Sequence, residues 1–134
     1  MIYFDSSALI KLIAPEPESP ALSSWVRERL ERRRATSALA KVDVMRRFRV
    51  DGPAAEDLAE IVLSKLDQLP VEQEVLDQAA ELRFGVGPVD AVHLATAMAE
   101  PTLHAYLSYD PVLLDIAGKL GLRTASPGFD GVLV

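Results

Sequence analysis

Short segments that suit strands alternate along the chain with longer segments that suit helices. The candidate strands are brief and lie at residues 2–4, 35–37, 103–108 and 122–125. The candidate helices mostly carry apolar residues three or four positions apart, and they lie at residues 8–13, 21–34, 39–48, 54–68, 73–84, 89–99 and 111–121. Strands that alternate with helices pair in parallel and are covered by helices. The pattern therefore predicts a three-layer α/β/α sandwich with a short parallel sheet and helices in excess.

The composition is that of one folded domain spanning residues 1–134. Apolar residues make up 49% of the chain, which is enough for a sizeable core. The chain has no cysteine, which excludes disulfide scaffolds, zinc–thiolate modules, iron–sulfur clusters and cysteine nucleophiles. The N-terminus lacks a basic segment, and no uncharged run reaches the roughly 18 residues that span a bilayer. We therefore expect a cytoplasmic protein that does not enter a membrane.

Charge is distributed unevenly. The formal net charge is −6, yet residues 27–49 hold nine basic against three acidic residues. That segment therefore carries +6, and the rest of the chain carries −12. One interpretation is a solvated helix face balanced by acidic neighbours, and the other is a patch that contacts phosphates or a partner beside an acidic pocket. The candidate contact residues are Arg32, Arg33, Arg34 and Arg46.

Four aspartates lie shortly after predicted strands or at the start of a helix. Asp5 directly follows the first strand, and Asp110 comes soon after the strand near the C-terminus. Asp43 lies about one helical turn past residues 35–37, and Asp90 lies in the first turn of a helix that follows a Gly-Pro loop. Parallel strands end at one edge of the sheet, and ligands bind beyond that edge. We therefore expect the four carboxylates to converge there.

Each aspartate also has a structural explanation. Asp5 and Asp110 suit helix N-caps, and Asp90 complements the positive end of a helix dipole. Asp43 can pair with the arginines three and four residues ahead of it. Convergence weakens these explanations, because two carboxylates about 4 Å apart repel by about 4 kcal/mol at an effective dielectric of 20. A cluster needs protons or a cation, and oxygen ligands without cysteine favour Mg²⁺ or Mn²⁺ over Zn²⁺.

His93 is a further candidate, because it lies three residues after Asp90 on the same side of the predicted helix. One interpretation is packing or a hydrogen bond within the helix layer. The other is a metal ligand or a general base.

Four segments carry a family resemblance. YFDSSALIKL (3–12), TSALAKVDVMRRF (36–48), GPVDAVHLATA (87–97) and LSYDPVLLDIAGKLGL (107–122) together resemble the PIN domain, in particular the VapC-type toxins of toxin–antitoxin pairs. The resemblance implies a PIN-like α/β/α sandwich and a ribonuclease that depends on Mg²⁺ or Mn²⁺. It also implies a homodimer and inhibition by a small cognate VapB-like antitoxin encoded beside it.

The resemblance assigns roles to the aspartates. Asp5, Asp90 and Asp110 match the first, third and fourth acids of the family, and Asp43 occupies the second position, where the family normally has glutamate. It implies that Asp5 and Asp90 hold the metal ion, with Asp43 and Asp110 binding directly or through water. Ser108 matches a small hydroxyl residue of the family, and both it and Ser6 are expected to orient the ligands.

Other functions remain open from the sequence. The shorter Asp43 leaves a catalytically weakened PIN module that binds antitoxin or RNA without turnover as the main alternative. A phosphatase of the haloacid dehalogenase kind also places an aspartate after its first strand, but it needs a second aspartate where this chain has Ser7. A receiver domain needs a different pairing of acids after that strand.

Overall fold

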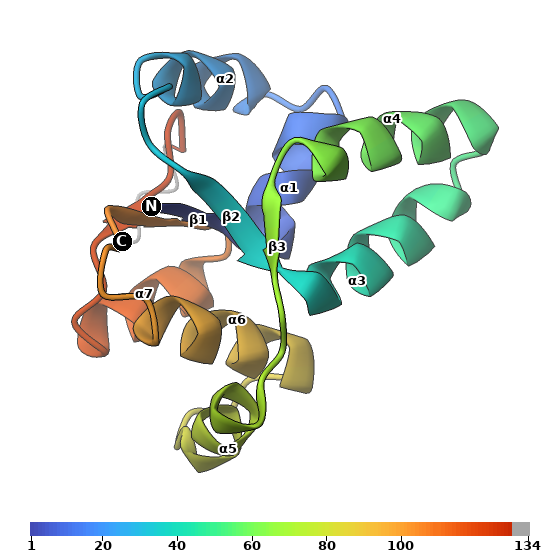
Figure 1. Ribbon diagram of the computed structural model, residues 1–134. Coiled ribbons are helices and arrows are strands. Elements are labelled where there is room, and N and C mark those ends of the chain that lie inside the picture. The colour runs from blue at the N-terminus through green and yellow to red at the C-terminus, as the bar shows by residue number, and fades with distance from the viewer. Residues whose placement is uncertain (130–134) are drawn as a thin grey trace.

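The computed structural model describes residues 1–129, which form a five-stranded parallel sheet in the order β3-β2-β1-β4-β5 (Figure 1). Residue Ile2 pairs with Arg34 on one side and with Ala105 on the other, so three strands begin at one edge. The strands are β1 (Ile2–Phe4), β2 (Arg34–Ser37), β3 (Asp67–Leu69), β4 (Ala105–Leu107) and β5 (Thr124–Ala125).

Helices cover both faces of the sheet, as the sequence predicts. The helices are α1 (Ser6–Ile13), α2 (Ser19–Arg27), α3 (Ala38–Arg49), α4 (Pro53–Ser64), α5 (Gln73–Glu81), α6 (Pro88–Met98) and α7 (Pro111–Lys119). Figure 1 shows α1, α2 and α4 on one side of the sheet and α5, α6 and α7 on the other. None of the helices in residues 1–129 is long and apolar enough to cross a membrane.

The alternation of side chains along β1 produces two cores. Ile2 and Phe4 point to one face and pack with buried residues of α1 to α4. Tyr3 points to the other face and packs with Leu94 of α6 and Tyr106 of β4. All five side chains are fully buried. The two cores pack against opposite faces of the sheet and so fix the positions of the residues that follow β1 and β4.

Three local predictions were wrong. The helix predicted for 21–34 ends at Arg27, and its last predicted residue starts β2. The helix predicted for 54–68 ends at Ser64, because β3 begins at Asp67. The strand β3 lies at the sheet edge and is largely exposed, so it has no apolar run by which the sequence could reveal it.

The buried face of α3 also differs from the predicted spacing. Apolar residues three positions apart in 39–48 predict Val42 on the apolar face with Met45 and Phe48, but Val42 is 55% exposed. Ala40 and Val44 are buried there instead, together with Met45 and Phe48. The four-residue spacing from Ala40 to Val44 follows the helix period of 3.6, whereas repeated steps of three rotate away from the core. The predicted C-terminal tail, 126–134, lies partly outside the described residues.

Candidate active site

Asp5 is the most buried acidic side chain of the candidate site. It caps the N-terminus of α1, where its Oδ1 accepts hydrogen bonds from the Ala8 amide at 3.0 Å and from the Ser7 hydroxyl at 2.6 Å. Only 1% of the residue is exposed. Its Oδ2 is buried and has no hydrogen-bond partner within residues 1–129. The helix cap therefore uses one carboxylate oxygen and leaves the other available to a ligand.

Burial raises the pKa of Asp5 from 3.8 to about 6. The nearby Ser108 hydroxyl and the hydrogen bonds from Ser7 and the Ala8 amide oppose this rise, and the negative charge of Asp90 adds to it. The carboxylate is therefore ionised at neutral pH at an energetic cost. A cation beside Oδ2 would remove that cost, so the residue fits a metal ligand.

Asp90 lies within electrostatic reach of Asp5 and of the other two aspartates. Asp90 is half-buried in the first turn of α6, and its pKa is raised by burial and by the charges of Asp110 and Asp43. Asp110 caps α7, where its Oδ1 accepts from the Val112 and Leu113 amides. Asp43 is exposed on α3. Asp90 is thus the acid whose charge interacts with those of Asp5, Asp43 and Asp110 at the carboxyl edge of the sheet.

The four aspartates differ in how deeply they lie at the carboxyl edge. Within the described part of the chain, no three histidine, aspartate or glutamate side chains are grouped closely enough to hold one ion. The buried Asp5 and the half-buried Asp90 lie deepest, whereas Asp43 reaches in from an exposed helix face. The arrangement brings four negative charges to one edge of the sheet.

Ser7 is a site residue that the sequence reasoning missed. Its hydroxyl donates to Asp5, lies 3.3 Å from the Ser108 hydroxyl and accepts from the Tyr109 amide at 2.8 Å. Ser108 in turn accepts from the Asp110 amide at 3.1 Å. These contacts join the residues that follow β1 to those that follow β4. The local signal that could have indicated the bond to Asp5 is a serine two residues after a capping aspartate.

Ser6, which was expected to orient an acid, contacts His93 instead. Its hydroxyl lies 2.9 Å from His93 Nε2, and the Tyr3 hydroxyl lies 2.7 Å from Nδ1. His93 is 1% exposed, and burial lowers its pKa from 6.5 to about 4. Both ring nitrogens of this neutral imidazole are occupied. The geometry supports the hydrogen-bonding interpretation, in which His93 ties α6 to β1 and α1.

The three neighbouring arginines do not line the acidic edge. Arg34 starts β2 opposite Ile2, so Arg32 and Arg33 precede the strand at the amino edge of the sheet. Asp5 follows the parallel strand β1 at the other edge, about 10 Å further along. The sequence could not reveal this separation. The basic segment 27–49 passes from a turn into strand β2, and that strand carries the chain from one edge of the sheet to the other.

The surroundings of these basic residues differ. Arg33 pairs with Asp67 of β3, and Arg32 lies near Glu31. Arg46 is exposed on α3, one turn after Asp43. Of the four candidate contact residues, it alone shares a helix with one of the four aspartates.

The fold is that of a known class. The chain belongs to the PIN domain family, which it matches over residues 2–119. It is similar to ribonuclease VapC35 of Mycobacterium tuberculosis, at 37% identity over 132 residues that cover 96% of this chain and 98% of that protein. It is also similar to ribonuclease VapC46 of the same species, at 41% identity over 128 residues that cover 94% and 97%.

Solved structures share the fold. A toxin–antitoxin complex from Klebsiella pneumoniae has a chain that superposes with a TM-score of 0.71 at 24% identity, covering 95% of this chain and 98% of that one. Mycobacterium tuberculosis VapC20, a sarcin–ricin-loop-cleaving toxin, superposes with a TM-score of 0.71 at 16% identity, covering 95% and 100%. At these identities the likeness concerns the fold, which is the three-layer PIN sandwich.

Proposed function

We propose that the chain is an endoribonuclease that depends on Mg²⁺ or Mn²⁺ and acts as the toxin of a VapBC-type pair. The observation that carries the proposal is the buried Oδ2 of Asp5, which has no partner within residues 1–129 and lies in the field of Asp90. A hard divalent cation is the ligand that such oxygens prefer. The ribonuclease names of relatives at 37% and 41% identity support the choice of RNA as substrate.

The chain's own residues have separate tasks in this proposal. Asp5 and Asp90 would hold the ion, and Asp43 and Asp110 would bind it directly or through water. When bound, a divalent ion neutralises charge on a phosphate and lowers the pKa of a water molecule. Ser7 fixes Asp5 by donating to Oδ1, so that Oδ2 would be left to bind the ion. In-line attack of water on phosphorus would leave a 5′-phosphate and a 3′-hydroxyl.

Ser108 sets the position of the fourth acid. Its hydroxyl accepts from the backbone amide of Asp110, while the Asp110 Oδ1 accepts two amides of α7. These bonds fix the direction in which the remaining carboxylate oxygen points. Arg46, one turn after Asp43 on an exposed face, is placed to contact an RNA phosphate.

The proposed partners are an RNA substrate, a second copy of the chain and a small VapB-like antitoxin. The Klebsiella pneumoniae chain with the same fold is part of a toxin–antitoxin complex, which supports the antitoxin. The dimer follows from the family resemblance. Leu58 and Ile61 on α4 are 45% and 52% exposed, so the outer side of that helix is partly apolar.

A catalytically weakened binding module is the second candidate. The exposed Asp43 is one methylene shorter than the glutamate expected at its position, so it reaches less far toward Asp5 and Asp90. The absence of a three-ligand group within residues 1–129 agrees with a loosely held ion. Turnover therefore separates the two candidates.

Cleavage of a labelled total-RNA pool tests the proposal. Wild type, Asp5→Ala, Asp43→Glu and the control Asp77→Ala are each assayed with Mn²⁺, Mg²⁺ or EDTA. Asp77 is exposed on α5 and serves as a matched loss of one carboxylate away from the site. We expect cutting that needs the metal, persists in Asp77→Ala and falls at least about 100-fold in Asp5→Ala.

The remaining outcomes discriminate the alternatives. Cutting by Asp43→Glu alone would identify a disabled site in an intact fold. If no variant cleaves RNA although circular dichroism shows normal folding, the result would favour the binding module. Full activity of Asp5→Ala would overturn the proposed mechanism.

A further inference from the structure

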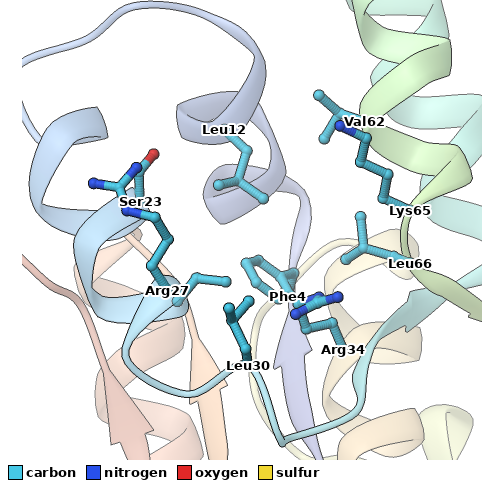
Figure 2. A pocket seen from close by; sticks show the side chains of 10 residues that line it. Phe4, Leu12, Ser23, Arg27, Leu30, Arg34, Val62, Lys65 and Leu66 are labelled. Carbon is cyan, nitrogen blue, oxygen red and sulfur yellow. The ribbon is translucent and has the colours of Figure 1, made fainter.

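Within residues 1–129, three buried side-chain atoms lack a hydrogen-bond partner. Two of them are Asp5 Oδ2 and the hydroxyl of Tyr106 in β4. The third is Nη1 of Arg34, which starts β2 at the amino edge and lines a groove with Phe4 and Leu66 (Figure 2). That groove lies on the face of the sheet covered by α1 and α4, whereas Tyr106 packs on the other face. An unpartnered acceptor and an unpartnered donor, Asp5 Oδ2 and the Tyr106 hydroxyl, therefore remain to be explained.

Tyr106 and Asp5 direct their side chains to the same face of the sheet. Tyr106 pairs with Tyr3 of the neighbouring strand β1, and the two rings stack with centroids 5.6 Å apart and planes 10° apart. Asp5 comes two residues after Tyr3 on extended backbone, and its amide continues the ladder by donating to the Leu107 carbonyl at 3.1 Å. Side chains two positions apart on an extended chain share a face. The Asp5 carboxylate is therefore a diagonal neighbour of the Tyr106 ring, at a separation that a long side chain bridges.

The Tyr106 hydroxyl lies in the field of the acidic site. Burial raises its pKa well above the ordinary value, and the negative charges of Asp5 and Asp90 raise it further. The hydroxyl therefore keeps its proton and is a hydrogen-bond donor beside two carboxylates.

The nearby histidine does not satisfy this hydroxyl. Both ring nitrogens of His93 are occupied, by the Tyr3 hydroxyl at 2.7 Å and by the Ser6 hydroxyl at 2.9 Å. A buried hydroxyl without a partner costs free energy, and phenylalanine would fill the same place in the stack without that cost. Asp5 Oδ2 is the buried acceptor on this face that still lacks a donor within the described residues.

We propose that Tyr106 is a positioning residue of the metal site, whose hydroxyl donates to Asp5 Oδ2 when that oxygen binds the ion. The inference rests on the proposed function and deepens it. A carboxylate oxygen has two lone pairs, so Oδ2 can accept the hydroxyl with one and bind the ion with the other. Ser7 and the Ala8 amide hold Oδ1, so a donor on Oδ2 leaves the carboxylate a single orientation. Such hydrogen bonds are often long or poorly aligned without ligand and tighten on binding, which agrees with the two unpartnered atoms.

Calorimetric titration of the full chain with Mn²⁺ measures the contribution of the hydroxyl without any RNA. Tyr106→Phe keeps the ring that stacks on Tyr3 and removes the hydroxyl. We expect the variant to bind Mn²⁺ about tenfold or more weakly than wild type. Tyr109→Phe is the matched control, because the Tyr109 hydroxyl donates to the Pro127 carbonyl, and it should bind Mn²⁺ as wild type does.

A spectroscopic measurement on the unaltered chain separates positioning from packing. The chain has three tyrosines, so ¹³C labelling at Cζ gives three signals, which Tyr3→Phe and Tyr109→Phe assign. Saturating Mg²⁺, which is diamagnetic, should shift the Tyr106 signal, because the Cζ chemical shift responds to hydrogen bonding of the attached hydroxyl. The Tyr109 signal should stay in place. A residue that only packs would not show this response.

The outcomes separate this inference from the proposed function. Unchanged Mn²⁺ affinity in a folded Tyr106→Phe variant would overturn the inference, as would equal weakening in Tyr109→Phe. If Tyr106→Phe does not fold, the Cζ signal decides, and a Tyr106 signal that does not respond to saturating Mg²⁺ overturns the inference. All these results leave metal-dependent cleavage by wild type intact. Wild type that binds no Mn²⁺ would overturn both, whereas Mn²⁺ binding that depends on Tyr106 without any RNA cleavage would overturn the nuclease alone.

Discussion

The buried Asp5 carboxylate makes the metal-free protein less stable than its packing allows. We predict that Asp5→Asn, which abolishes cleavage, raises the free energy of unfolding in EDTA at pH 7.5. Asparagine is nearly isosteric with aspartate, and its Oδ1 can still accept from Ser7 and from the Ala8 amide. The substitution removes the charge that burial and Asp90 disfavour, and it puts an NH2 group in the place of Oδ2.

The pKa of Asp5 gives the magnitude. A rise from 3.8 in the unfolded chain to about 6 in the folded protein corresponds to about 3 kcal/mol. The folded state binds the proton more tightly, so ionisation destabilises it. This loss is complete above about pH 7, shrinks as the pH falls through 6, and is absent below 3.8. For a domain of this size, 3 kcal/mol corresponds to a melting-temperature difference of roughly 10 °C.

Thermal and urea unfolding of wild type and Asp5→Asn, each at pH 7.5 and at pH 5, measures the effect. The comparison of the two proteins isolates Asp5, because His93 contributes equally to both. In EDTA the variant should be the more stable at pH 7.5, with a smaller advantage at pH 5. Saturating Mn²⁺ should stabilise wild type and leave the variant nearly unchanged. A variant that is less stable than wild type at pH 7.5, or an advantage that does not shrink at pH 5, would refute the reasoning.

Three further predictions concern the surroundings of the acids. Ser7→Ala should lower kcat/KM for RNA about tenfold, because Asp5 Oδ1 loses the hydrogen bond that orients the carboxylate. Ser6→Ala loses a contact to His93 instead and should lower kcat/KM less. Steady-state cleavage by the two variants measures the difference. Asp43→Glu should raise kcat/KM roughly tenfold, and an unchanged rate would show that reach at this position is not limiting. His93→Gln should lower the free energy of unfolding by about 2–4 kcal/mol at pH 7 in urea. Wild type should lose this advantage as the pH falls from 6.5 toward 4, because the histidine of the unfolded chain then binds a proton that the buried imidazole does not bind.

Local chemistry made much of the fold predictable. The run at residues 2–4 was too short and too apolar to be anything but a buried strand, and β1 covers those residues. Asp5 and Asp110 were recognisable as helix caps, and both cap helices in the structure. The edge strand β3 escaped prediction because its residues are mostly exposed and lack alternation. Its place in the sheet depends on pairing with β2, which is a long-range contact.

The candidate site was also predictable only in part. The four aspartates could be chosen from their positions relative to strands and helix starts. The partner of each serine could not, because Ser6 and Ser7 are neighbours whose side chains leave the helix start in different directions. Ser7 meets Ser108 and the Tyr109 amide about a hundred positions away, and Ser6 meets His93 on α6.

The sequence by itself determined which residues bear charge, where helices begin and that the sheet is parallel, because these follow from local propensity and periodicity. Only the tertiary structure decided which of those residues share a surface. The parallel register of β1 and β2 puts Asp5 at one edge and Arg34 at the other, although the basic run is close to Asp43 in sequence. The aspartates at the carboxyl edge are therefore separated from the arginines that precede β2, because parallel strands all begin at one edge of the sheet and end at the other.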